Sequence, residues 1–150
     1  MIQRIQSVYL LINVICYTLI LFVPLATINA EYSLNAWFFG TANGDVLAPV
    51  YLLGLTAIII SILSLVNIFL YKNRPFQNKL CVAIFVIIML FMALLFFIYP
   101  EILINKVINS AKIDYTIWTI FAVLPLATTM FANRAILKDE KKVRAADRIR

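Results

Sequence analysis

The sequence predicts an all-α membrane protein, a bundle of four antiparallel transmembrane helices followed by a cytoplasmic helical extension at the C-terminus. Of its 150 residues, 64% are hydrophobic and only 13% are charged, and the mean hydropathy is +0.97. A soluble chain of this length needs a larger polar surface than 13 basic and 7 acidic side chains supply. The apolar excess is therefore expected to face lipid, with residues 1–150 forming a single membrane domain.

Four uncharged runs predict the number of helices, and they cover about residues 8–28, 50–71, 80–99 and 115–132. A hydrocarbon layer about 30 Å thick needs roughly 20 apolar residues at about 1.5 Å each, so each run can cross it once. The runs lack alternating polarity, which favours helices over barrel strands. Pro24 and Pro125 are expected to bend the first and fourth helices, and Pro100 to end the third.

A cleaved signal peptide is the alternative reading of the first run. The apolar stretch is about twice the length of a usual signal-peptide core, and Ile28 fits a small-residue cleavage site poorly. We therefore expect the first run to be retained as a span.

The positive charges predict the orientation of the chain. Eleven of the 13 Lys and Arg residues lie at the amino end, between the second and third runs, or in the tail 133–150, whereas Lys106 and Lys112 lie on the other side. Cytoplasmic segments retain Lys and Arg, so both termini are expected to be cytoplasmic. The tail contains no Gly or Pro and is expected to be a basic helix that lies on anionic lipid headgroups or docks on a partner. Nucleic acid is not an expected partner, because no base-reading fold accompanies the charges.

Two outer segments also carry patterns. Trp37, Phe38 and Phe39 are expected to form an interfacial aromatic belt or a docking patch for a partner. A turn signal, Asn43-Gly44, follows them. Residues 101–112 have the spacing of an amphipathic helix, either a separate interfacial helix or a bent continuation of the third span.

The available side chains exclude most catalytic chemistry. The chain has no His, and its two cysteines, Cys16 and Cys81, are expected at different depths. No ionisable group lies inside a predicted span, and no nucleophile has an activating partner, so no enzyme activity, cofactor or metal is expected. Asn13 and Asn67, both in the predicted cytoplasmic half, are expected to hold helices together by bonding to each other or to a partner helix.

The two ends of the chain carry its most specific motifs. These are Met1-Ile2-Gln3-Arg4-Ile5-Gln6-Ser7 at the start, and Ala132-Asn133-Arg134-Ala135-Ile136 and Ala146-Asp147-Arg148-Ile149-Arg150 near the end. With them the chain resembles the domain-of-unknown-function family 4293, small four-span inner-membrane proteins of Bacteroidota. The resemblance covers almost the whole chain and implies an inner-membrane location, but it implies no catalytic residues. If both ends are cytoplasmic, a polar cluster or docking surface is expected from Arg4, Gln6, Asn133, Arg134, Asp139 and Asp147.

Two classes of function are consistent with these features. The first is a non-enzymatic accessory or scaffold subunit of a larger membrane complex, which binds other membrane proteins or a second copy of itself. The alternative is a lipid or hydrophobic small-molecule binding or transport protein, with a cavity between bent helices.

Overall fold

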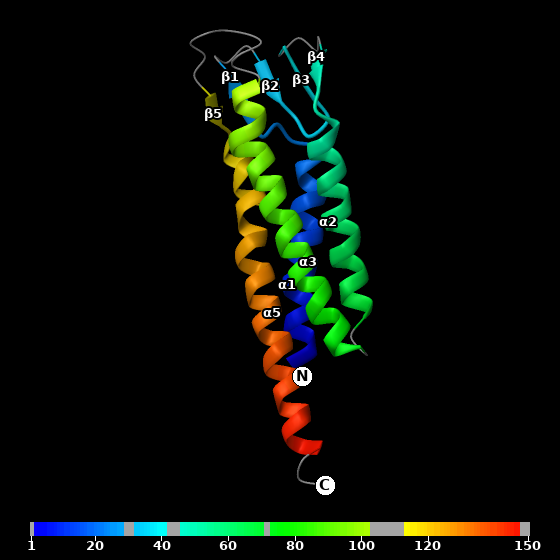
Figure 1. Ribbon diagram of the computed structural model, residues 1–150. Helices are drawn as coiled ribbons and strands as arrows, with labels where there is room; N and C mark the ends of the chain where they lie inside the picture. Colours follow the sequence, from blue (N-terminus) through cyan, green and yellow to red (C-terminus); the bar gives the residue numbers. More distant parts are fainter. Residues whose placement is uncertain (1, 29–31, 42–45, 71–72, 103–112, 148–150) are drawn as a thin grey trace.

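The computed structural model describes residues 2–28, 32–41, 46–70, 73–102 and 113–147. This part of the chain is mostly helical, with helices α1 (Ile2–Ile20), α2 (Tyr51–Phe69), α3 (Arg74–Ala93) and α5 (Ile120–Asp147). A π-helical turn, η1 (Leu94–Ile98), continues α3, and a 3₁₀ turn, η2 (Ile117–Thr119), precedes α5. The helices lie side by side and alternate in direction (Figure 1).

Each helix packs against two neighbours. α1 contacts α2 and α5, and α3 contacts the same two helices. The interior is tightly filled, as shown by the edge-to-face contact of Tyr17 and Phe91, whose ring centroids are 5.2 Å apart. Large apolar side chains cover much of the outer surface, and Phe69 and Phe97 are both more than 70% exposed. Among the described residues, three stretches are long and apolar enough to cross a membrane: Tyr51–Phe69, Pro75–Ile102 and Ile117–Asp139. The apolar part of α1, Ile5–Ile20, is shorter.

A small antiparallel sheet covers one end of the helices (Figure 1), so the all-α prediction is wrong in this respect. Its strands are β1 (Ala26–Ile28), β2 (Tyr32–Leu34), β3 (Phe38–Thr41), β4 (Val46–Pro49) and β5 (Ile113–Tyr115), in the order β4-β3-β2-β1-β5. Thr27 pairs with Ser33 on one side and with Asp114 on the other. Pro49 lies in an edge strand, where the missing N–H costs the sheet least. We call this end of the molecule the sheet end and the opposite end the tail end.

The first helix is shorter than the predicted span of residues 8–28. α1 ends at Ile20, and Ala26–Ile28 is a strand. Pro24 therefore follows the helix and does not bend it, since a proline ring and its missing N–H disfavour continuation. A short apolar run such as Leu25–Ile28 suits a buried strand as well as a helix, and the hydrophobic pattern alone does not separate the two.

Pro100 does not end the third helix, which continues through it to Ile102. In the preceding π-helical turn the Tyr99 N–H donates to the Leu94 carbonyl, five residues back. A widened turn of this kind relieves the clash between a proline ring and the carbonyl four residues before it. Pro125, in contrast, lies inside α5 as predicted. Of the predicted amphipathic segment 101–112, residues 103–112 lie outside the described residues, as does the Asn43-Gly44 turn.

Candidate functional site

Asn13 is the centre of a buried polar contact between the first and last helices. Its Nδ2 donates to Thr129 Oγ1 at 2.7 Å, and Thr128 Oγ1 donates to Asn13 Oδ1. Thr128 Oγ1 also lies 3.2 Å from the Pro125 carbonyl oxygen. All three side chains are buried, so each amide atom that water would otherwise satisfy has a partner from the protein. This contact holds α1 against α5.

Two further bonds extend the polar contacts to the other helices. The Cys81 thiol on α3 donates to the Thr129 carbonyl oxygen, with Sγ and O 3.6 Å apart. Gln77 Nε2, near the start of α3, donates to the Asn67 carbonyl oxygen on α2 at 3.2 Å. Every helix therefore joins another through a polar group in the half of the bundle nearer the tail end.

The structure separates the two asparagines that the sequence analysis placed in one half of the bundle. Asn13 bonds to α5 and not to Asn67. Asn67 is fully buried, and neither atom of its side-chain amide has a hydrogen-bond partner among the described residues. The hydroxyls of Ser61 and Ser64, on the same helix, also lack one within that part of the chain. α2 thus places a row of unpaired polar groups toward the interior.

The structure describes four of the six side chains in the cluster predicted from the two chain ends. Gln6 is 4% exposed, Asn133 and Asp139 are half-buried, and Arg134 is exposed. Asp147 is the last residue of α5, which extends beyond the other helices at the tail end (Figure 1). The side chains of Arg4 and Asp147 lie outside the described residues. The cluster of all six therefore stays a prediction.

The three predicted aromatic residues have different environments. Phe39 is fully buried and stacks on Tyr32 with ring centroids 5.8 Å apart. Trp37 is partly buried and packs directly over Gly54 of α2, while Phe38 is half-buried in β3. Phe39 thus contributes to the core and not to an exposed docking patch.

A groove of about 260 Å³ lies between α3 and α5. It is lined by Cys81, Val82, Phe85, Thr129, Met130 and Asn133. Cys81 and Thr129 are buried, whereas Val82 and Met130 are exposed, so the groove opens on the outer surface of the helices. The sequence analysis expected a cavity between bent helices but did not place one between α3 and α5, because the walls of this groove depend on the register of two helices that are distant in sequence. In the described part of the chain, no three His, Cys, Asp or Glu side chains gather as a metal site.

The fold and its apolar outer surface define a class, a helical protein with segments long and apolar enough to cross a membrane. The chain belongs to the family described as "Domain of unknown function (DUF4293)", whose model matches residues 2–149. This match confirms the resemblance inferred from the two chain ends. No curated protein and no solved structure matches the chain.

Proposed function

We propose that the protein resides in a bacterial inner membrane and crosses it four times, with both termini in the cytoplasm. α1 is the fourth span, because its 19 residues reach about 28 Å and it packs against α2 and α5. The described basic residues Lys79, Arg134 and Lys138 lie toward the tail end, whereas Glu101 and Asp114 lie toward the sheet end. The distribution of Lys and Arg supports a cytoplasmic tail end.

This orientation is testable with a matched pair of exposed positions. In a chain with Cys16 and Cys81 replaced by Ser, we expect Asp114→Cys to react with a membrane-impermeant maleimide in intact cells. Lys138→Cys is expected to react only after the cells are lysed, because the bilayer shields the cytoplasmic face. Labelling of Lys138→Cys in intact cells, or protection of Asp114→Cys, would contradict the proposed orientation.

Within the membrane, the protein acts as a non-enzymatic accessory or scaffold subunit of a larger complex. The supporting observation is the length of α5, which has 28 residues and reaches about 42 Å, longer than a bilayer core of about 30 Å. Its last part extends beyond the other helices (Figure 1). A short helical segment without packing neighbours is only marginally stable in water, so contact with a partner or with lipid headgroups would stabilise this basic extension.

Native pull-down and crosslinking from the protein's own membrane test the accessory role. We expect the full chain to recover at least one other membrane protein in mild detergent. Replacing Lys141, Lys142 and Arg144 with Gln should weaken that recovery, because it removes basic charge from the extension. Replacing Lys106 and Lys112 with Gln is the matched control and should leave recovery unchanged. Recovery of only a monomer or a homo-oligomer under several conditions would overturn the accessory role.

The second candidate function is binding or transport of a lipid or a hydrophobic small molecule. One observation favours it: the groove between α3 and α5 opens on the apolar surface and has a polar residue, Asn133, in its lining. Ligand sites commonly combine an apolar wall with a few polar groups that orient the ligand.

A further inference from the structure

We propose that the groove between α3 and α5 binds one phospholipid, with an acyl chain along its apolar wall and the headgroup at the Asn133 end. The inference rests on the membrane location proposed above and not on the accessory role. Val82 and Phe85 of α3 and Met130 of α5 form the apolar wall. The volume, about 260 Å³, is below the roughly 300–1,000 Å³ of sites that enclose a whole small-molecule ligand. It therefore suits part of one acyl chain.

The position of the polar end follows from the register of the two helices. The Cys81–Thr129 bond places these residues at one level, and α3 and α5 run in opposite directions (Figure 1). Asn78, three residues before Cys81, and Asn133, four residues after Thr129, are therefore both about 5–6 Å nearer the tail end. Asn78 also shares a stripe of α3 with Cys81 and Val82. Asn133 lines the groove at this end, and Asn78 lies outside the lining at a similar level.

Both amides have unused hydrogen-bonding capacity. Asn78 Oδ1 and Asn133 Oδ1 are buried and have no hydrogen-bond partner among the described residues. In the orientation of the structure, the buried atom of each amide is the oxygen. A headgroup with an ammonium or hydroxyl group would donate to these oxygens, which removes the cost of leaving them unpaired.

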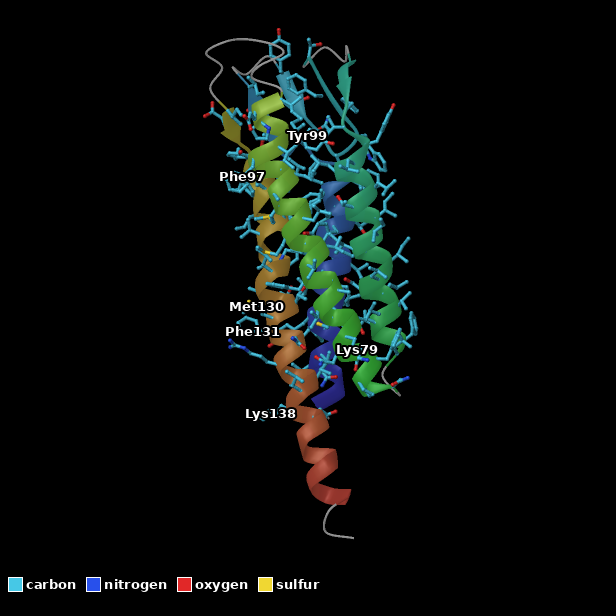
Figure 2. The ribbon with its side chains drawn as sticks, in the orientation of Figure 1. Lys79, Phe97, Tyr99, Met130, Phe131 and Lys138 are labelled. Carbon is cyan, nitrogen blue, oxygen red and sulfur yellow. The ribbon has the colours of Figure 1, made fainter. Side chains whose placement is uncertain are left out.

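Positive charge flanks the same end. Lys79 lies three residues before Val82, and Arg134 lies four residues after Met130, so each lies about one helical turn nearer the tail end than a groove residue. Both side chains are exposed. Figure 2 shows Lys79, and Lys138 one turn beyond Arg134, in the half of the molecule away from the sheet. Among the acidic side chains that the structure describes, Asp139 belongs to this end, and it is half-buried.

These three features together select a phospholipid. The apolar wall accepts an acyl chain, the amide oxygens accept hydrogen bonds from the headgroup, and the cations attract its phosphate. A neutral quinone would leave the cations unused. Phosphatidylethanolamine and phosphatidylglycerol have N–H or O–H donors, whereas the quaternary ammonium of phosphatidylcholine has none. We therefore expect the groove to prefer the first two.

Native mass spectrometry of the purified full chain, titrated with each of these three phospholipids, tests the proposal. We expect one tightly retained lipid per chain and stronger retention of phosphatidylethanolamine and phosphatidylglycerol. Val82→Trp fills the groove from α3 and should weaken retention by about tenfold, a change that loss of contact with roughly two methylene groups would produce. Ala83→Trp, at an exposed position on the face of α3 turned away from Cys81 and Phe85, should retain lipid like the unaltered protein.

Two further variants, one in the apolar wall and one at the polar end of the groove, complete the test of lipid binding. Met130→Trp fills the groove from the opposite helix and should weaken retention to the same extent as Val82→Trp. It replaces Val82→Trp as the test if Val82→Trp folds poorly. Asn133→Leu should weaken the headgroup preference, because it removes one of the two amide oxygens, while phosphatidylcholine is still retained. Unchanged retention in both Trp variants of the groove wall, equal loss in Ala83→Trp, or a headgroup preference that Asn133→Leu leaves undiminished would overturn the proposal. Partner recovery in the native pull-down is expected to be unaffected by Val82→Trp, which separates this test from that of the accessory role.

Discussion

Replacing Gly54 with leucine is expected to destabilise the protein by about 3 kcal/mol, the upper part of the usual range for overpacking a core. A Cβ atom built on Gly54 would lie 2.6 Å from Trp37 Cε3 and 2.7 Å from Cζ3. The ring has little freedom to withdraw, because the Val50 N–H donates to the Trp37 carbonyl oxygen at 2.9 Å and holds the backbone of the segment between β2 and β3. The free energy of unfolding in mild detergent is the measurement.

Two comparisons separate this steric effect from a general cost of added bulk. Ala83→Leu adds all of the same carbon atoms except Cβ at an exposed position of α3, and we expect it to change stability by less than about 0.5 kcal/mol. Trp37→Ala removes the ring, so Gly54→Leu should cost much less in that background. An equal cost in both backgrounds would show that the contact between the ring and α2 is not the cause.

Replacing Asn13 with leucine is expected to cost about 1–2 kcal/mol, because it removes both hydrogen bonds between α1 and α5 at similar side-chain volume. Thr129 Oγ1 loses its donor, and Thr128 Oγ1 keeps only its bond to the Pro125 carbonyl oxygen. The free energy of unfolding of Asn13→Leu, Thr129→Val and the double variant forms a cycle whose non-additive part measures the contact.

Thr56 provides the matched control for this cycle. Its hydroxyl donates to the Leu52 and Leu53 carbonyl oxygens of its own helix, so Thr56→Val removes no contact between helices. We expect Thr56→Val and Asn13→Leu to be additive within about 0.5 kcal/mol. Strict additivity of Asn13→Leu and Thr129→Val would mean that the bond between these side chains contributes nothing to the association of α1 and α5.

The helical part of the fold was predictable because it depends on local pattern. Uncharged apolar runs over 50–71 and 80–99 correspond to α2 and to the larger part of α3. The sheet was not predictable in the same way, since three-residue strands leave little periodicity to detect. β1 also pairs with β5, where Thr27 meets Asp114, which lies 87 positions further along the chain, and nothing in either segment alone indicates that pairing.

For the candidate sites too, local pattern was informative, whereas contacts between distant segments were not predictable. The sequence identified Asn13 as a residue that holds helices together, because a polar side chain in an apolar span needs a partner. It did not identify Thr128 and Thr129 as that partner in preference to Asn67. The aromatic run at 37–39 was recognised as a feature, yet its residues have three different environments, and the burial of Phe39 depends on the pairing of β3 with its neighbours.

By itself, the sequence determined that this chain has lipid-compatible helices, a basic C-terminal segment and membership of its family, because composition, run length and end motifs are properties of consecutive residues. Only the tertiary structure decided that Ala26–Ile28 is a strand, that Trp37 covers Gly54, and that Cys81 lies beside Thr129 with a groove at their side. Each of these contacts joins segments that are separated along the chain, and the packing of whole helices and strands sets their register.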